Sequence, residues 1–256
     1  MQLIRNVGYI KSQQRRGRLL TGVGFVGLAI AFVLVWLQRE NAPLIIAAYA
    51  LMIVGFLCFN MGLQTIGKFV SNERKKRPDE QVDKALARLN DRHTAIHYVQ
   101  LGKRTVDHLI VHTSGVLVLT LREVTGKVIV NERTWRKGGN PLGRLMNYSA
   151  PQLGNPSGDN DAAVEAVRET LREAGLPENV EGAIVFTNPL AEVSGESPID
   201  VVGIDGLLEL VRDVANAEGT TPLNSRDRGA VVAALSQGAE FEQPAPRLER
   251  RKRTAA

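Results

Sequence analysis

Two uncharged apolar runs stand near the start of the chain: residues 19–37 are LLTGVGFVGLAIAFVLVWL, and residues 43–63 are PLIIAAYALMIVGFLCFNMGL. Each run is about 20 residues long, which as a helix is enough to cross a hydrocarbon core of roughly 30 Å. Only Gln38 to Ala42 separates them. The sequence therefore predicts a transmembrane helical hairpin over residues 19–70, with spans at about 19–37 and 43–63.

A cleaved signal peptide and a buried helical hairpin are the alternatives to membrane spans. The first run is longer than the apolar part of a signal peptide, and a second run follows at once. A buried hairpin needs a large shell of soluble protein around two wholly apolar helices, and the rest of the chain is too small for that. Both alternatives are therefore disfavoured.

Basic residues flank the hairpin on both outer sides, whereas the short connecting segment has one Arg and one Glu. By the positive-inside rule, both termini and the soluble part lie in the cytoplasm, and residues 1–18 form a basic cytoplasmic N-terminus. We expect the flanking charges to contact anionic lipid head groups, at about 1 kcal/mol each. They are Arg5, Lys11, Arg15, Arg16 and Arg18 before the first run, and Lys68, Arg74, Lys75, Lys76 and Arg77 after the second.

The formal charge of +5 does not describe the soluble part of the chain. Residues 78–246 hold 16 Lys and Arg against 24 Asp and Glu, so this part is acidic. The basic excess lies beside the apolar runs and in the tail at residues 247–253. The single cysteine, Cys58, lies in the second run, which excludes an intramolecular disulfide. Charge alone therefore does not indicate a general nucleic-acid-binding protein.

The soluble part is expected to be one mixed-sheet α/β domain at residues 79–239, after a basic linker at 71–78 and before a disordered basic tail at 240–256. We expect it to fold without the hairpin, because its elements supply their own apolar faces. Asp205 and Ser225 are the expected N-caps of the last two helices, and a short helical turn is expected near Gln152. Periodicity and turn signals predict helices from Asp79, at 161–174, 206–217 and 226–237, and strands at 106–112, 116–121, 127–131, 182–186 and 199–204.

Residues 105–127, TVDHLIVHTSGVLVLTLREVTGK, begin a strand with Asp-His and continue through a Gly-hydrophobic hairpin. With the residues around them they resemble the NERD, or nuclease-related, domain over roughly Asp79 to Leu210. The resemblance implies a restriction-endonuclease-like fold with a PD-(D/E)XK type core. It rests on the order and spacing of Glu80, Asp107, His108, Gly115, Gly126, Trp135, Pro151 and Gln152.

The resemblance implies a metal-dependent nuclease site, from which this sequence departs. Thr120 and Arg122 stand where the family pattern has Glu-x-Lys. Thr120 offers no carboxylate to a hard cation, and Arg122 cannot act as a base because it does not deprotonate. Glu123 is the nearest substitute, but strand alternation directs it to the other face unless a bulge intervenes. The prediction is a vestigial site without a cofactor, made of Glu80, Asp107, Thr120, Arg122 and Gln152.

Three functions stay open at this point. The first is an inactive binding or scaffolding module, with nucleic acid or a protein as partner. The second is an active nuclease with Glu80, Asp107 and Glu123 around one Mg²⁺, for which Asp107 and Glu80 are the metal-ligand candidates. The third is a structural membrane protein without a nucleic-acid role. The basic candidates for nucleic-acid contact are Lys103, Arg104, Arg122, Lys127, Arg133, Arg136 and Lys137.

The four histidines form two pairs at i,i+4 spacing, His93 with His97 and His108 with His112. On a helix this spacing suits a transition metal. The second pair lies in a predicted strand, and the first has no third ligand nearby in sequence. A zinc site is therefore disfavoured, and Trp135 is expected to be a packing aromatic rather than a ligand platform.

Overall fold

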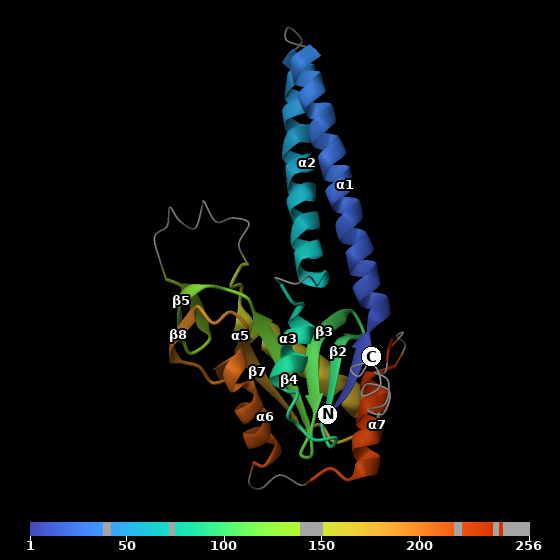
Figure 1. The fold of residues 1–256 in the computed structure, drawn as a ribbon, viewed down its shortest axis with the longest axis vertical. Coiled ribbons are helices and arrows are strands. Elements are labelled where there is room, and N and C mark those ends of the chain that lie inside the picture. Colours follow the sequence, from blue (N-terminus) through green and yellow to red (C-terminus); the bar gives the residue numbers. More distant parts are fainter. Residues whose placement is uncertain (38–41, 72–74, 139–150, 218–221, 238–240, 243–256) are drawn as a thin grey trace, which may run out of the picture. The chain divides into compact units, whose positions relative to one another are not determined.

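The computed structural model describes residues 1–37, 42–71, 75–138, 151–217, 222–237 and 241–242 (Figure 1). These residues divide into two compact units: residues 9–77 form one, and residues 1–8 with 78–256 form the other. The connecting segment at 38–42, the linker expected at 71–78 and the tail expected at 240–256 fall wholly or partly outside the described residues.

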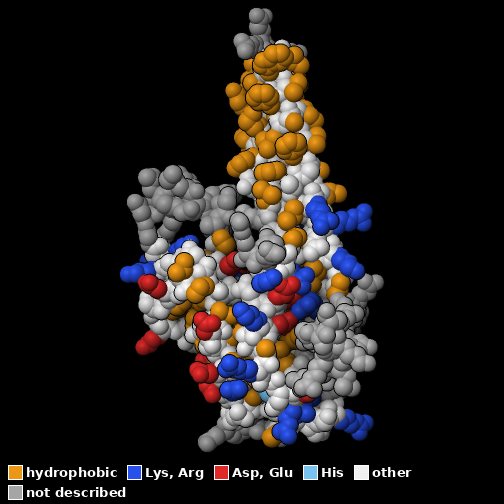
Figure 2. Space-filling view, viewed as in Figure 1, with side chains coloured by type: hydrophobic (Ala, Val, Ile, Leu, Met, Phe, Trp, Pro, Cys, Tyr) orange, Lys and Arg blue, Asp and Glu red, His pale blue; other side chains and the backbone are white. Residues whose placement is uncertain are grey.

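The first unit is a hairpin of two helices, α1 (Val7–Leu37) and α2 (Ala42–Phe69). Both are long and apolar enough to cross a membrane, and Figure 2 shows apolar side chains covering their surface. α1 begins well before the expected span, because the Lys, Gln and Arg residues of its first turns favour helix. α2 likewise continues to Phe69 instead of ending near residue 63.

Small residues spaced seven apart line the contact between the two helices. Gly17, Gly24 and Ala31 are the buried positions of α1 after Ile10. On α2 the corresponding positions are Ala48, Gly55 and Gly62. A Cβ added at Gly24 would overlap the backbone of Phe59, so only glycine permits this approach. Close backbone packing of small residues is typical of helix pairs in membranes.

The second unit is a mixed-sheet α/β domain, as predicted. Its main sheet has the order β10-β1-β2-β3-β4-β7-β9, in which β3 is antiparallel to β2 and β4, while β4, β7 and β9 are parallel. A smaller sheet has the order β6-β5-β8. The strands are β1 Gln2–Asn6, β2 Thr94–Leu101, β3 Arg104–Val111, β4 Val116–Arg122, β5 Gly126–Asn131, β6 Thr134–Lys137, β7 Val180–Phe186, β8 Ala191–Glu196, β9 Asp200–Gly203 and β10 Phe241–Glu242.

Helices cover both faces of the main sheet. On one face, α5 (Pro156–Glu173) and α7 (Ser225–Leu235) bury side chains such as Val167 and Val231 against Ile96 and Val118. On the other face, α3 (Pro78–Ala85) and α6 (Leu207–Ala215) pack against β3, β4 and β7. The 3-10 turn η1 (Ile204–Gly206) leads into α6. This three-layer arrangement fixes which helix each strand residue can reach.

Both ends of the described chain take part in the main sheet, which the sequence did not predict. Gln2–Asn6 lie in β1, parallel to β2, so the segment expected to be only a basic N-terminus contributes a strand. Phe241–Glu242 pair with β1 inside the segment expected to be disordered. A fragment that begins at Arg77 would lack β1 and leave β2 without that neighbour.

The helix caps differ from the expected ones. Gly206, not Asp205, is the N-cap of α6, since Asp205 lies within the 3-10 turn. Asn224, not Ser225, caps α7 by accepting a hydrogen bond from the Asp227 amide at 2.8 Å. Residues 151–155 form no helical turn, and α5 begins only at Pro156, where proline suits the first helical position.

Candidate functional site

The motif positions Asp107, Thr120 and Arg122 lie on two neighbouring strands, beyond one end of the β3–β4 ladder. The β3–β4 ladder ends at the pair His108 and Leu119, so Asp107 and Thr120 are the next residues of their strands beyond it. Arg122 is the last residue of β4. The structure thus brings together the positions at which the family pattern has its Asp and its Glu-x-Lys.

The Thr120 side chain forms a hydrogen bond with an uncharged group. Its hydroxyl oxygen accepts from Asn160 Nδ2 at 3.0 Å, and the same amide lies 3.2 Å from the Ala183 carbonyl oxygen and 3.4 Å from that of Val118. Asn160 is buried at the N-terminal part of α5. Gly182 on β7 makes room for it, because a Cβ there would overlap the Asn160 side chain. A neutral, packed network therefore surrounds the position where the pattern has a metal-binding carboxylate.

The Arg122 side chain links the end of β4 to the start of α5. Its Nε donates to the Leu153 carbonyl at 2.8 Å, and its Nη1 donates to the Leu121 carbonyl at 3.1 Å. Its Nη2 donates to Asp159 in the first turn of the helix. These bonds use all three nitrogens of the guanidinium. Arg122 thus holds two segments together, in contrast to a lysine that orients a nucleophile.

The other predicted site residues lie on separate segments. Glu80 is in the first turn of α3, on the sheet face opposite α5, and is partly exposed. Gln152 is exposed and stands next to Leu153, which the Arg122 side chain contacts. Glu123 follows the last residue of β4, so strand alternation no longer fixes its direction. Among the described residues, no group of three or more His, Cys, Asp or Glu side chains is arranged to hold a metal ion.

Trp135 is a packing residue, as expected. Its indole Nε1 donates to the Ser157 hydroxyl at 2.7 Å, and its ring lies 6.1 Å from that of Phe186. It joins β6 to an apolar cluster that includes Val128, Leu153 and Phe186.

The basic candidates fall into two groups. Lys103 and Arg104 lie at the turn between β2 and β3. Lys127, Arg133, Arg136 and Lys137 lie on or between β5 and β6. Arg133 is paired with Asp161, and Lys127 has Glu192 as its cross-strand neighbour. Figure 2 accordingly shows basic and acidic side chains intermixed on the visible face of the domain.

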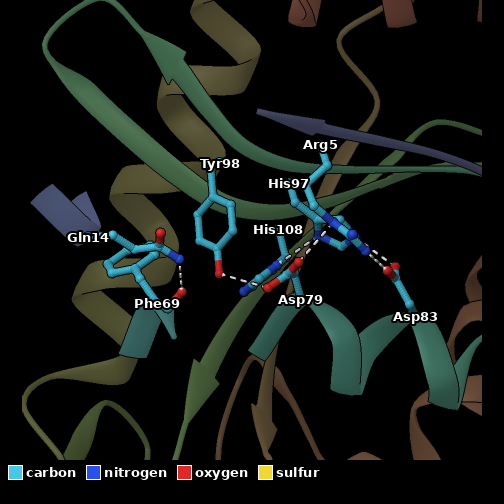
Figure 3. A network of polar contacts seen from close by, with 8 residues as sticks. All are labelled: Arg5, Gln14, Phe69, Asp79, Asp83, His97, Tyr98 and His108. Carbon is cyan, nitrogen blue, oxygen red and sulfur yellow. Dashed lines mark hydrogen bonds and ion pairs between the residues drawn. The ribbon is translucent and has the colours of Figure 1, made fainter. Parts of the chain in front are cut away.

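A partly buried network of ion pairs and hydrogen bonds connects β1 to α3. Arg5 Nε lies 2.8 Å from Asp79 Oδ2, and Arg5 Nη2 donates to Asp83 Oδ2 (Figure 3). Asp79 is fully buried, and Asp83 is 13% exposed. Tyr98 donates its hydroxyl hydrogen to Asp79 Oδ1 at 3.3 Å. Buried charges need such partners, and removing one partner is strongly destabilising.

Two histidines extend this network into the sheet. His97 Nε2 lies 2.9 Å from Asp83 Oδ1, and His97 Nδ1 lies 2.9 Å from His108 Nδ1 (Figure 3). His97 and His108 are cross-strand neighbours on β2 and β3. The histidines thus pair across strands instead of along a helix. The i,i+4 spacing of the histidines did not predict this network, because the strands β1 and β2 were not predicted.

The other two histidines are buried beyond the ends of the same strands. His112 Nδ1 accepts from the Ser114 amide at 3.2 Å, and His93 Nδ1 is 2.8 Å from Asn90 Oδ1. Burial, with a smaller electrostatic contribution from His93, lowers the pKa of His112 to about 4. Burial also lowers the pKa of His93, although its hydrogen bond with Asn90 opposes this. Both side chains are therefore neutral at neutral pH.

Tyr98 has an unusual backbone conformation, with φ of 62°. It is fully buried, and it stands opposite Asp107, between the cross-strand pairs His97 with His108 and Val99 with Val106. A left-handed conformation is uncommon for a bulky residue and persists only where neighbouring contacts hold it. The strained position is thus adjacent to the one acidic residue of the β3–β4 motif.

In the described part of the domain, α3 is followed by the antiparallel strands β2, β3 and β4, and later by α5 and the parallel strand β7. The motif positions lie on β3 and β4. The family model of the nuclease-related domain, NERD, matches residues 74–187, so this part of the chain is a nuclease-related domain. The match ends one residue after β7. No curated protein and no solved structure matches the chain significantly.

Proposed function

We propose that the chain is a membrane-anchored nuclease-related protein that does not hydrolyse nucleic acid and acts as a binding or scaffolding module. The observation that carries this proposal is the bonding of Thr120 and Arg122. The Thr120 hydroxyl is a neutral partner of Asn160, and all three Arg122 nitrogens bind Leu153, Leu121 and Asp159.

Metal-assisted phosphodiester hydrolysis needs anionic oxygen ligands and a group that activates water. Threonine at 120 provides no negative charge, so Asp107 would hold Mg²⁺ with one fewer carboxylate from the sheet. Mg²⁺ gives up its water reluctantly and requires several well-placed oxygens. The full chain should therefore bind Mg²⁺ no more tightly than an Asp107→Ala variant when titrated by calorimetry. Clear loss of affinity in Asp107→Ala would contradict the proposal and favour an active nuclease.

Nucleic acid is the partner class that the charge distribution supports. Residues 103–144 hold eight Lys and Arg against three Asp and Glu, whereas residues 151–246 hold five against 17. A phosphate backbone is repelled by the second region and attracted by the first. The exposed side chains of Lys127 and Arg136 support a contact on β5 and β6.

Binding can be tested with labelled single- and double-stranded DNA and RNA in salt titrations. Three phosphate contacts would weaken duplex binding roughly 40-fold between about 50 and 200 mM salt. Arg136→Gln should weaken binding and flatten this slope. Arg172→Gln is the matched control, because it removes an exposed arginine from acidic α5. Equal effects of both variants, or no salt-sensitive binding, would contradict a nucleic-acid partner.

The proposal includes the membrane arrangement: α1 and α2 anchor the protein in the bilayer, and both termini and the domain are cytoplasmic. The basic residues on the outer flanks of the hairpin support this orientation. Cysteine labelling of intact cells, with Cys58 replaced by serine and a cysteine introduced at Ala256, should leave the tail protected until the cells are opened. Labelling of the tail in intact cells would contradict it.

A further inference from the structure

The chain leaves the domain for the helical hairpin at β1 and re-enters it at α3. β1 ends at Asn6, and α1 begins at the next residue, Val7. α3 begins at Pro78, after the segment that follows α2. Within the domain these two elements are bonded directly, through Arg5 with Asp79 and Asp83. The elements that connect to the hairpin therefore share one partly buried ion-pair cluster.

Residues of β1 and α3 also contact Tyr98 on β2. Asn6 Nδ2 donates to the Tyr98 carbonyl at 3.0 Å, and the Tyr98 hydroxyl donates to Asp79, which Arg5 holds. His97, the preceding residue, also points to α3, where it meets Asp83. Two consecutive strand residues normally point to opposite faces. The left-handed backbone of Tyr98 is what lets both side chains reach α3 (Figure 3).

We propose that β1 is a latch strand whose docking against β2 and α3 holds Tyr98 in its left-handed conformation. Undocking removes the Asn6 hydrogen bond and leaves Asp79 and Asp83 without Arg5. Tyr98 then relaxes to an extended conformation, which changes the β2–β3 ladder opposite Asp107. A displacement of α1 that pulls on β1 would thereby alter the motif-bearing strand. The latch strand β1 thereby couples the helical hairpin to the domain.

Hydrogen exchange measured by mass spectrometry tests the latch in the full chain, reconstituted in vesicles of phosphatidylcholine and phosphatidylglycerol. Asn6→Ala removes one side-chain hydrogen bond, and Arg5→Met removes the ion pairs. Each should speed amide exchange in residues 94–111 by about tenfold or more, as expected when a buried hydrogen bond is lost, with β7 changed less than about twofold. Arg172→Met is the control, because it breaks an exposed ion pair with Glu178 outside the network.

A disulfide can close the latch independently of Arg5. Ile4 and Ile96 are directly paired on β1 and β2, so Ile4→Cys with Ile96→Cys, in a Cys58→Ser background, would lock the strand in place. In the Arg5→Met protein the oxidised lock should restore slow exchange in residues 94–111, and reduction should abolish the restoration. Unchanged exchange in Asn6→Ala and Arg5→Met, an equal rise in β7, or a lock that restores nothing would each overturn the proposal.

Discussion

Replacing Gly182 with alanine should destabilise the domain strongly, and only while Asn160 is present. A Cβ at position 182 would overlap Asn160 Oδ1, and its next neighbour would be Val164 Cγ2 at 3.0 Å. Inserting a methyl group into a packed core costs about 1–3 kcal/mol, and the rigid bonding of Asn160 places this case at the upper end.

Asn160→Ala alone should cost about 2–4 kcal/mol of unfolding free energy. Asn160 Nδ2 donates to Thr120 Oγ1 and lies within hydrogen-bond distance of the carbonyls of Ala183 and Val118, so the substitution removes several buried hydrogen bonds at once. In the Asn160→Ala background the overlap at 182 disappears, so Gly182→Ala should cost less than about 1 kcal/mol. The double-mutant cycle should thus show a coupling of about 2 kcal/mol.

The assay is urea unfolding of the full chain in detergent micelles, followed by Trp135 fluorescence in a Trp36→Phe background. Trp135 contacts Phe186 at the end of β7 and reports on this part of the core. Gly203→Ala is the matched control, because a Cβ there meets nothing within 4 Å. An equal cost of Gly182→Ala with and without Asn160 would refute the described packing around Thr120.

Three further predictions follow from other parts of the molecule. Because the pKa of His112 is lowered from 6.5 to about 4, the unfolded chain binds this proton at higher pH than the folded chain. The contribution of His112 should be full above about pH 6.5 and fall by up to about 3 kcal/mol as the pH drops to 4. In urea unfolding, His112→Asn, which keeps an acceptor for the Ser114 amide, should reduce the slope by that amount and leave the smaller part due to His93. Gly24→Leu should separate α1 from α2 and reduce cross-linking between them in vesicles, whereas Gly22→Leu, at a position with open space, should not. Deleting residues 1–6 should lower the unfolding midpoint of the domain, because β2 loses its parallel neighbour; an unchanged midpoint would show that β1 is dispensable.

The helices and the central strands could be predicted because their apolar residues repeat with the period of the element. β3, β4 and β7 lie within two residues of the predicted strands. β2, TAIHYVQL, was missed because it is buried on both faces and includes the buried His97, so it shows no alternation of apolar and polar residues. β8 was missed because its residues AEVSGE are largely exposed and polar. β1 is only five residues long and lies among basic residues.

The candidate site was predictable in part. The resemblance identified Thr120 and Arg122 as departures from the metal-binding pattern, because they lie in a recognisable local stretch. Their bonding partners were not predictable, since Asn160 and Leu153 are brought to them only by the folding of α5 against β4. The Arg5 network was missed for the same reason, because the whole helical hairpin separates β1 from α3 in the sequence.

Metal-dependent cleavage by the full chain tests the central claim most directly. Purified protein should be incubated with Mg²⁺ or Mn²⁺ and single- or double-stranded DNA and RNA, beside an Asp107→Ala variant and a Thr120→Glu, Arg122→Lys variant. We predict no cleavage above the Asp107→Ala background, and a gain of metal binding if the double variant folds. Cleavage by the natural protein that disappears in Asp107→Ala would contradict the account.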